Sequence, residues 1–198
     1  MPPRSKKNHK AEKSRSGQFR IIGGQWRSRR CSFPELEGLR PTTDRVRETL
    51  FNWLQFDLPG AAVLDAFAGS GALGFEALSR GAEKVWMLEQ NASACLSLKG
   101  NAVSLNANAE IIQTNALEWI NRCEQQFDLV FIDPPFRKGI LAEFLEKLES
   151  ADCLKPGAKI YLEQEKELQA QLVPEGWQLL KEKVAGQVAY RLYTRASE

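Results

Sequence analysis

The segment Asp133-Pro134-Pro135-Phe136 carries the residues that most directly indicate a chemistry. It follows the apolar run 127–132, which predicts a buried strand. The carboxylate can accept a proton or a hydrogen bond, and prolines have no N–H, so adjacent carbonyls stay free to accept from a ligand. An aromatic ring can stack on a flat base. The segment therefore suits a planar exocyclic amine, such as N2 of guanine or N6 of adenine, although Asp-Pro after a strand is also ordinary turn chemistry.

A glycine-rich loop near a carboxylate indicates a cofactor site. The stretch 63–74 is a predicted strand, loop and helix start, and Gly69, Gly71 and Gly74 fit the G-x-G-x-x-G pattern, which is weak evidence by itself. Asp65, at the predicted strand's end, could hold the α-ammonium of S-adenosylmethionine, whereas it would repel the pyrophosphate of NAD.

Two further strand ends offer polar groups for a nucleoside. Glu89 ends the next predicted strand, where an acid can bridge ribose hydroxyls of either cofactor. Asn115-Ala116 ends the third predicted strand and could hydrogen-bond adenine, but Asn115 could equally cap a helix. These positions support a cofactor site without choosing the cofactor.

The elements that must position these residues alternate between strand and helix from residue 61 onward. This rhythm predicts a parallel sheet with helices on both faces. The last part of the chain, 177–194, has a turn at Ala185-Gly186 and predicts an antiparallel hairpin instead. The expected strands are 62–68, 84–89, 110–115, 127–133 and 158–163, and the expected helices include 72–80, 92–105 and 141–150.

The composition narrows the possible functions. His9 is the only histidine, which excludes His-based hydrolytic triads and argues against a zinc site. The four scattered cysteines indicate reduced thiols, as expected in the cytoplasm, and no apolar stretch approaches the roughly 20 residues that span a bilayer. A catalyst here would work with carboxylates, backbone groups and a cofactor, and without a metal.

Charge is distributed unevenly along the chain. Residues 1–30 contain ten Lys/Arg and one acid, a net +9, whereas the other 168 residues carry 17 Lys/Arg and 24 acids, a net −7. Residues 1–17 read as a flexible basic tail. Residues 18–39 read as a β-hairpin extension that turns at Gly23-Gly24, with 25–30 as its second strand. A basic hairpin indicates a nucleic-acid contact, although the lysines of the tail could equally be solvated surface.

The motifs together resemble a known family. Asp65, Phe67 and the glycine loop, followed by Asp133-Pro134-Pro135-Phe136, are similar to class I amino-methyltransferases that use S-adenosylmethionine. The segment 40–48, Phe51-Asn52, and the two hairpins resemble the RsmD family of bacterial 16S ribosomal RNA guanine-N2 methyltransferases. The likeness covers residues 18–198.

The resemblance implies an α/β fold of Rossmann-like type: a doubly wound, mostly parallel seven-stranded sheet ending in an antiparallel hairpin, with an N-terminal β-hairpin extension before a methyltransferase domain at 40–198. It implies S-adenosylmethionine as cofactor, and the small ribosomal subunit with its 16S RNA as partner. The implied cofactor residues are Thr43, Asp65, Ala66, Phe67, Gly69, Ser70, Gly71, Glu89, Asn115 and Ala116. The implied RNA contacts are Arg20, Trp26, Arg27, Arg29, Arg30 and Arg45. Asp133 through Phe136 would hold the target amine and base.

Three other interpretations compete. An adenine-N6 methyltransferase would use a similar loop, but a DNA enzyme needs a larger recognition domain than 33–60 could supply. A non-catalytic RNA-binding assembly factor would not need the intact Asp65 and Asp133, and an NAD enzyme gives 133–136 no role. A single catalytic domain favours a cytoplasmic monomer.

Overall fold

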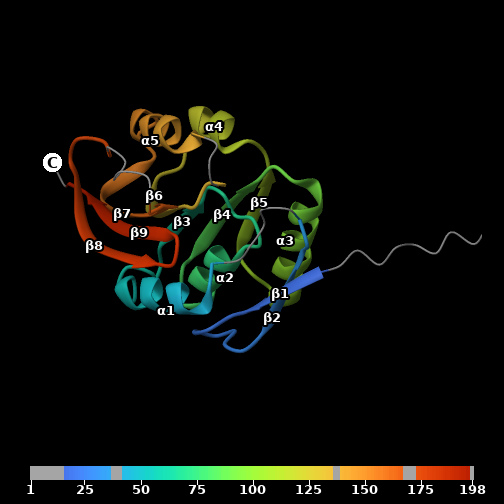
Figure 1. Ribbon diagram of the computed structural model, residues 1–198. Coiled ribbons are helices and arrows are strands. Elements are labelled where there is room, and N and C mark those ends of the chain that lie inside the picture. The colour runs from blue at the N-terminus through green and yellow to red at the C-terminus, as the bar shows by residue number, and fades with distance from the viewer. Residues whose placement is uncertain (1–15, 37–41, 136–138, 167–172, 197–198) are drawn as a thin grey trace, which may run out of the picture.

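The computed structural model describes residues 16–36, 42–135, 139–166 and 173–196 (Figure 1). Phe136, Arg40, Pro41 and His9 lie outside the described residues, as does most of the basic tail. The elements are β1 (Ser16–Arg20), β2 (Arg30–Pro34), α1 (Asp44–Trp53), β3 (Ala62–Asp65), α2 (Ala72–Ser79), β4 (Lys84–Glu89), α3 (Ala92–Leu105), β5 (Ala109–Gln113), α4 (Ala116–Trp119), the 3-10 helix η1 (Ile120–Arg122), β6 (Phe127–Ile132), α5 (Ile140–Ser150), β7 (Leu154–Glu165), β8 (Trp177–Ala185) and β9 (Val188–Arg195).

The expected seven-stranded sheet is confirmed. Its order is β5-β4-β3-β6-β7-β9-β8, with parallel pairing from β5 to β7 and antiparallel pairing among β7, β9 and β8. The strand expected over 62–68 ends at Asp65, because the chain turns there into the glycine loop. Since β3, β4, β5 and β6 are parallel, the residues that follow them meet at one edge of the sheet.

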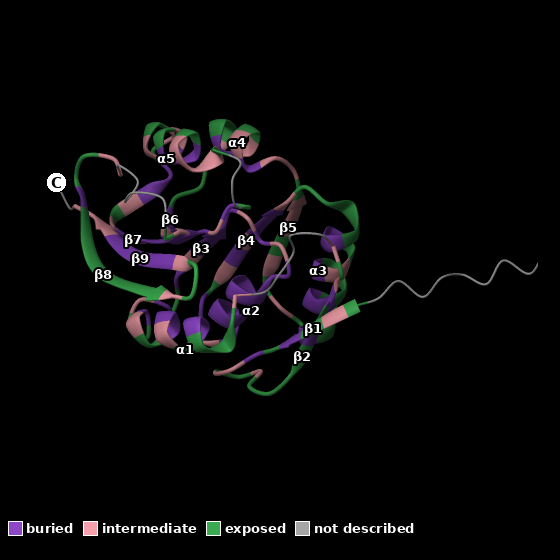
Figure 2. Ribbon diagram, in the orientation of Figure 1, coloured by how far each residue is buried: buried purple, intermediate pink, exposed green. Residues whose placement is uncertain are grey.

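Helices cover both faces of the sheet, as the alternating pattern predicts (Figure 1). One face packs against α1, α2, α3 and the hairpin, through residues such as Leu50, Phe75 and Leu98. The other face packs against α4 and α5, through residues such as Phe144 and Leu148. Both layers are buried along the central strands, whereas β8 is exposed along most of its length (Figure 2).

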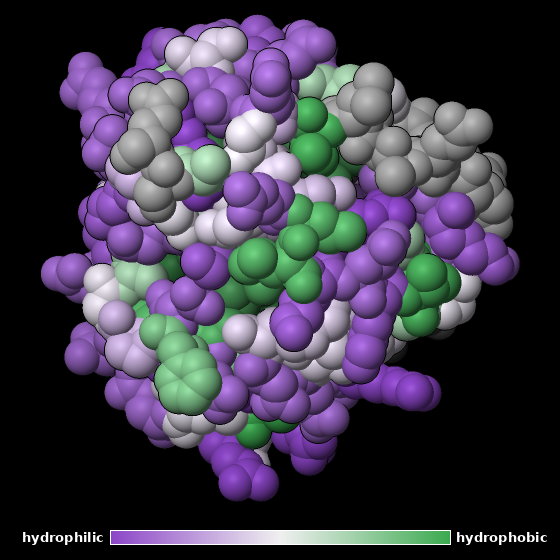
Figure 3. Space-filling view, turned by 90° about the vertical axis from the view of Figure 1, so that its left-hand side faces the viewer, coloured by the Kyte–Doolittle hydropathy of each residue, from purple (hydrophilic) through white to green (hydrophobic). Residues whose placement is uncertain are grey.

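Charged side chains, more than burial, protect the edge strand β8 from pairing with another chain. Exposed apolar side chains gather on the face that carries it (Figure 3), and those of β8 are Leu179, Leu180 and Val184. The run 181–183 places Lys, Glu and Lys in the middle of this strand. Charged side chains on an edge strand discourage pairing with another chain.

The N-terminal hairpin differs from the expectation. β1 pairs antiparallel with Arg30–Pro34, not with 25–30, and it includes Ser16 and Gly17 of the predicted tail. Residues 21–29 instead turn against α2, where Gln25 N–H donates to the carbonyl of Ser79 at 2.8 Å. Gly24 has φ +74°, and a Cβ there would lie on the Ser79 carbonyl oxygen. Contact with α2 therefore replaces the expected strand.

A buried acid on α2 joins the hairpin to the domain. The Glu76 carboxylate accepts hydrogen bonds from the backbone N–H of Ile22 and of Gly23, both at 2.8 Å. It also pairs with Arg47 at 3.4 Å, and both side chains are fully buried. Arg47 in turn donates to the Arg20 carbonyl at 2.8 Å and pairs with Asp44 at 2.6 Å. Glu76 and Arg47 thus fasten the hairpin to α1 and α2.

Candidate active site

The glycine loop between β3 and α2 depends on two left-handed glycines. Gly69 has φ +51° and Gly71 has φ +82°, a region that costs a side-chain-bearing residue about 1–2 kcal/mol. A Cβ at Gly71 would lie 2.5 Å from Leu98 Cδ2 and 2.8 Å from Phe75 Cε2. The core therefore leaves no room for a side chain at Gly71, and the turn of the loop depends on glycine at this position.

Asp65 lies directly beneath this loop. It is 3% exposed, and its Oδ2 accepts a hydrogen bond from Gly74 N–H of α2 at 3.1 Å. Burial raises the pKa of Asp65 to about 7, and the nearby Glu89 carboxylate contributes to this rise. Asp65 is therefore a buried carboxyl group poised between its two protonation states near neutral pH.

Glu89 and Asn115 occupy the ends of the neighbouring strands, as the sequence predicts. Glu89 accepts from Gly69 N–H at 3.0 Å and from Asn91 N–H at 2.7 Å, so it holds the glycine loop. Asn115 Oδ1 accepts from Leu117 N–H at 2.8 Å and caps α4. Asn115 therefore caps a helix, which was one of its two predicted roles. Its amide NH2 group takes no part in this contact.

Other predicted cofactor residues line the same edge. Ala66, Ser70 and Ala116 are buried, while Phe67 is half-buried and packs edge-on against Phe144 with ring centroids 5.1 Å apart. Thr43 is exposed as the N-cap of α1, where its Oγ1 accepts from Val46 N–H at 3.4 Å, and the preceding Thr42 contacts Glu163 on β7. The other predicted cofactor residues end or follow β3, β4 and β5, so Thr43 comes from a separate segment.

Asp133 follows β6 and completes the edge next to β3. The residue is half-buried, and its carboxyl group lies inside the molecule. Burial, then the nearby Glu163 and Asp65 carboxylates, raise the pKa of Asp133 well above its usual range. Pro134 is buried and Pro135 is exposed. Asp133 is thus a carboxyl group surrounded by other acids.

Sequence reasoning missed Glu163 on β7. It is 5% exposed, and its Oε1 accepts hydrogen bonds from Tyr161 Oη at 2.7 Å and from Thr42 Oγ1 at 3.4 Å. The signal available in the sequence was an acid at the end of an apolar strand, Ala158–Glu163. Such a residue looks like an ordinary strand end until the sheet order places β7 beside β6.

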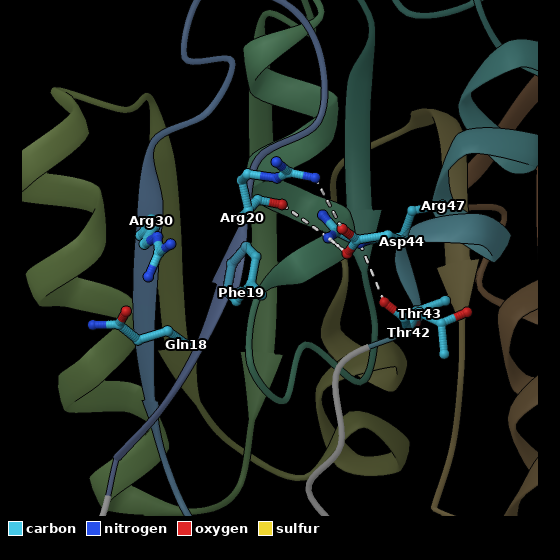
Figure 4. Close-up of a pocket in the computed structure, with 8 residues that line it drawn as sticks. All are labelled: Gln18, Phe19, Arg20, Arg30, Thr42, Thr43, Asp44 and Arg47. Carbon is cyan, nitrogen blue, oxygen red and sulfur yellow. Dashed lines mark hydrogen bonds and ion pairs between the residues drawn. The ribbon is translucent and has the colours of Figure 1, made fainter.

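A second feature lies between the hairpin and α1. A pocket of about 450 Å³ lies there. Figure 4 shows the residues that line it, which are Gln18, Phe19, Arg20, Arg30, Thr42, Thr43, Asp44 and Arg47. Arg20 and Arg30 face each other across the two strands of the hairpin. Arg20 pairs with Asp44 at 3.5 Å, whereas Arg30 has no ion pair with any described residue. The pocket therefore carries excess positive charge.

The remaining predicted RNA contacts are spread over the hairpin and α1. Arg27 and Arg45 are exposed, and Arg29 is exposed while donating to the Ser104 carbonyl at 2.8 Å. Trp26 is half-buried and packs against the core, so only part of its ring faces solvent. Its contribution to packing was not expected from the sequence.

In the described ranges, no group of three or more His, Cys, Asp or Glu side chains could hold a metal ion. None of the helices in those ranges is long and apolar enough to cross a bilayer. All four cysteines are free thiols, and only Cys123 is not buried.

Comparison with known proteins places the chain in a family. Residues 19–194 match the family model described as "Conserved hypothetical protein 95". Ribosomal RNA small subunit methyltransferase D of Escherichia coli is 50% identical over 98% of this chain and 96% of its own, and the Haemophilus influenzae protein of the same name is 47% identical over 89% and 94%. The solved structure of the Escherichia coli protein YhhF is 50% identical and matches with a TM-score of 0.85, covering 92% of this chain and all of that one. The chain therefore belongs to the RsmD family of S-adenosylmethionine-dependent ribosomal RNA methyltransferases.

Proposed function

We propose that this chain methylates the exocyclic N2 amine of a guanine in 16S ribosomal RNA, within the small ribosomal subunit. One observation carries the proposal: Asp133 follows the strand next to the one that ends in Asp65, so the amine-holding loop and the cofactor loop share one sheet edge. Relatives named ribosomal RNA small subunit methyltransferase D support the choice of substrate.

The residues at this edge suit S-adenosylmethionine. Asp65, Asp133 and Glu163 are acidic, and none forms a salt bridge with a described Lys or Arg. Buried acids without a cationic partner favour a positively charged ligand. We assign Asp65 to the α-ammonium, Glu89 to the ribose and the loop of Gly69 and Gly71 to close backbone approach. When bound, S-adenosylmethionine supplies a methyl group already activated by its positive sulfur.

The work left to the protein is to orient the target amine. The N2 lone pair of guanine is delocalised into the ring, so it is a poor nucleophile until the amine is turned. Asp133 and the carbonyl near Pro134 would each accept one N–H, which directs the lone pair toward the methyl donor. Such positioning can supply several kcal/mol of the barrier reduction. Phe136, by its place in the motif, would stack on the base.

We assign RNA binding to the basic hairpin and the pocket beside it. Arg20, Arg30 and Arg27 are exposed cations on one extension of the domain, and phosphate contacts dominate the affinity of proteins for RNA. The Lys-rich tail would add to this attraction. A short basic arm on one domain favours a monomer of 22.3 kDa, and a ribosomal substrate would be met in the cytoplasm.

The test is methyl transfer to small ribosomal subunits from a strain that lacks this protein. Labelled S-adenosylmethionine is supplied, and the RNA is digested to nucleosides. We expect label in N2-methylguanosine at one position of 16S RNA. Label in N6-methyladenosine, or subunits left unlabelled by a protein that binds the cofactor, would overturn the proposal. The first result would indicate the adenine chemistry and the second an assembly factor.

A further inference from the structure

Glu163 lies next to Asp133 at the edge of the sheet. β6 and β7 are parallel, with Phe131 opposite Tyr161 and Ile132 opposite Leu162, so Asp133 and Glu163 follow as the next neighbours. Side chains alternate between faces, so these two acids point to the same face as Phe131 and Tyr161. That face is the one covered by α1 and α2, toward which Asp65 also points.

The Glu163 carboxylate is held rigidly on one side. Its Oε1 accepts from the hydroxyls of Tyr161 and Thr42, at 2.7 and 3.4 Å. Tyr161 is buried and packs edge-on against Phe131, with ring centroids 6.1 Å apart. Thr42 comes from the segment before α1, so Glu163 is held both from its own strand and from a segment 121 residues away in the chain.

Among the described residues, no positively charged group shifts the pKa of Asp133 or Glu163. The titratable groups facing them are Asp65 from β3, Tyr161 from β7 and Tyr190 from β9. Burial raises the pKa of Glu163, while its bonds from Tyr161 and Thr42 oppose that rise. Ionising both neighbouring acids in a buried site is costly, so the pair retains one proton, which either carboxyl group can carry.

We propose that Glu163 is a positioning residue that controls the protonation of Asp133 and shares the proton that Asp133 takes from the target amine. This inference rests on the proposed function. Before the step concerned, the resident proton of the pair leaves to solvent, so that Asp133 is a carboxylate. One N–H proton of the methylated amine then moves to a carboxylate oxygen of Asp133, and the N–H electron pair stays on nitrogen. Glu163 accepts part of that positive charge through the shared proton. Tyr161 and Thr42 fix the position of its carboxylate.

The test uses Glu163→Gln, which keeps an oxygen that Tyr161 and Thr42 can donate to but removes the charge. Without the neighbouring anion, Asp133 should lose its proton at lower pH. We expect the acid limb of the kcat profile to move down by at least about one pH unit, so the ratio of kcat at pH 6 to kcat at pH 8 rises about tenfold. KM for the small subunit should change less than about threefold, since Glu163 does not touch the RNA.

A second readout does not depend on turnover. In the free protein, ¹³C-detected titration of the Asp133 carboxyl should show its midpoint falling by about one unit in Glu163→Gln. Glu163→Ala should give the same shift with a lower melting temperature. Glu110→Gln is the matched control, because Glu110 on β5 is an exposed acid that pairs with Lys84 of β4. The pH profile of this variant should equal that of the wild type.

The outcomes separate the inference from the function. Profiles and titrations of Glu163→Gln that superimpose on the wild type would overturn the inference and leave the methyltransferase intact. A wild-type protein that methylates no guanine would reject the proposed function, and with it the proton transfer. In that case a shifted Asp133 titration would still establish that Glu163 raises the pKa of Asp133.

Discussion

The carboxyl edge of the sheet and the N-terminal hairpin both concentrate charge, but they do so in opposite ways. At the sheet edge, Asp65 and Glu163 are buried acids without described cationic partners. On the hairpin, Arg27 and Arg30 are exposed cations. Buried charge is weakly screened and acts strongly on neighbouring groups, whereas exposed charge is screened and acts mainly on association. The difference assigns chemistry to the edge and recognition to the hairpin.

The largest effect is expected at the edge. Asp133→Ala removes the acceptor that orients the amine, so we expect kcat to fall about 10³-fold or more. Affinity for S-adenosylmethionine, measured by calorimetry, should change less than about threefold. Asp128→Ala is the control at the other end of the same strand, where the side chain pairs with Lys155 at 2.8 Å. Equal turnover in Asp133→Ala and wild type would show that Asp133, at this edge of the sheet, takes no part in catalysis.

The buried contacts of Glu76, which join the hairpin to the domain, should have the largest effect on the free energy of unfolding. Glu76→Ala leaves Arg47 buried and two backbone N–H groups of the hairpin without their acceptor. We expect a loss of about 3–5 kcal/mol in the free energy of unfolding, with faster hydrogen exchange at Ile22 and Gly23. Glu110→Ala, which breaks an exposed pair, should cost less than about 1 kcal/mol. Similar costs for the two variants would contradict the buried joint.

A comparison of Gly71 with Gly60 distinguishes crowding in the cofactor loop from the effect of backbone strain alone. Gly71 and Gly60 have φ +82° and +75°, but only Gly71 is crowded, because nothing lies within 4 Å of a Cβ at Gly60. We expect Gly71→Ala to lose about tenfold or more in affinity for S-adenosylmethionine and Gly60→Ala to bind normally, both measured by calorimetry. Gly60→Ala should cost only the strain, about 1 kcal/mol. Unchanged affinity in Gly71→Ala would place the cofactor elsewhere.

The pKa of Asp65 predicts a pH dependence of cofactor binding. In the free protein Asp65 is protonated below about pH 7, and a cationic ligand favours its carboxylate. Binding should therefore release a proton, and affinity should rise roughly tenfold from pH 5.5 to 7. Calorimetry in buffers of different ionisation enthalpy measures both. Proton uptake on binding would show that Asp65 does not face the ammonium.

The smallest effect is expected on the hairpin. Arg30→Ala removes one phosphate contact, so KM for the small subunit should rise about threefold. The slope of log affinity against log salt should become shallower by about 0.7. Arg122→Ala removes an exposed arginine of η1, an element that packs on the opposite face of the sheet from the hairpin. Arg122 has no ion pair among the described residues, so the variant should change neither quantity. Equal effects of both variants would show that the hairpin attracts RNA no more specifically than any other positive charge on the surface.

The sheet and its site were predictable from local patterns, and the errors came from distant contacts. Asp65, Glu89 and Asp133 could be identified because each ends an apolar strand, and parallel strands bring their ends together. The second hairpin strand was wrong because Gln25 and Gly24 use their backbone against Ser79, 54 or more residues away in the chain. Glu163 was missed for the same reason, since its significance depends on which strand lies beside it.

The division between chemistry and recognition is tested most directly by single-turnover methyl transfer at saturating small subunits, together with the affinity for those subunits. For Asp133→Ala we expect wild-type affinity and almost no transfer. For Arg30→Ala we expect weaker affinity and, at saturation, the wild-type rate. A reduced rate at saturation in Arg30→Ala, or lost affinity in Asp133→Ala, would contradict the account.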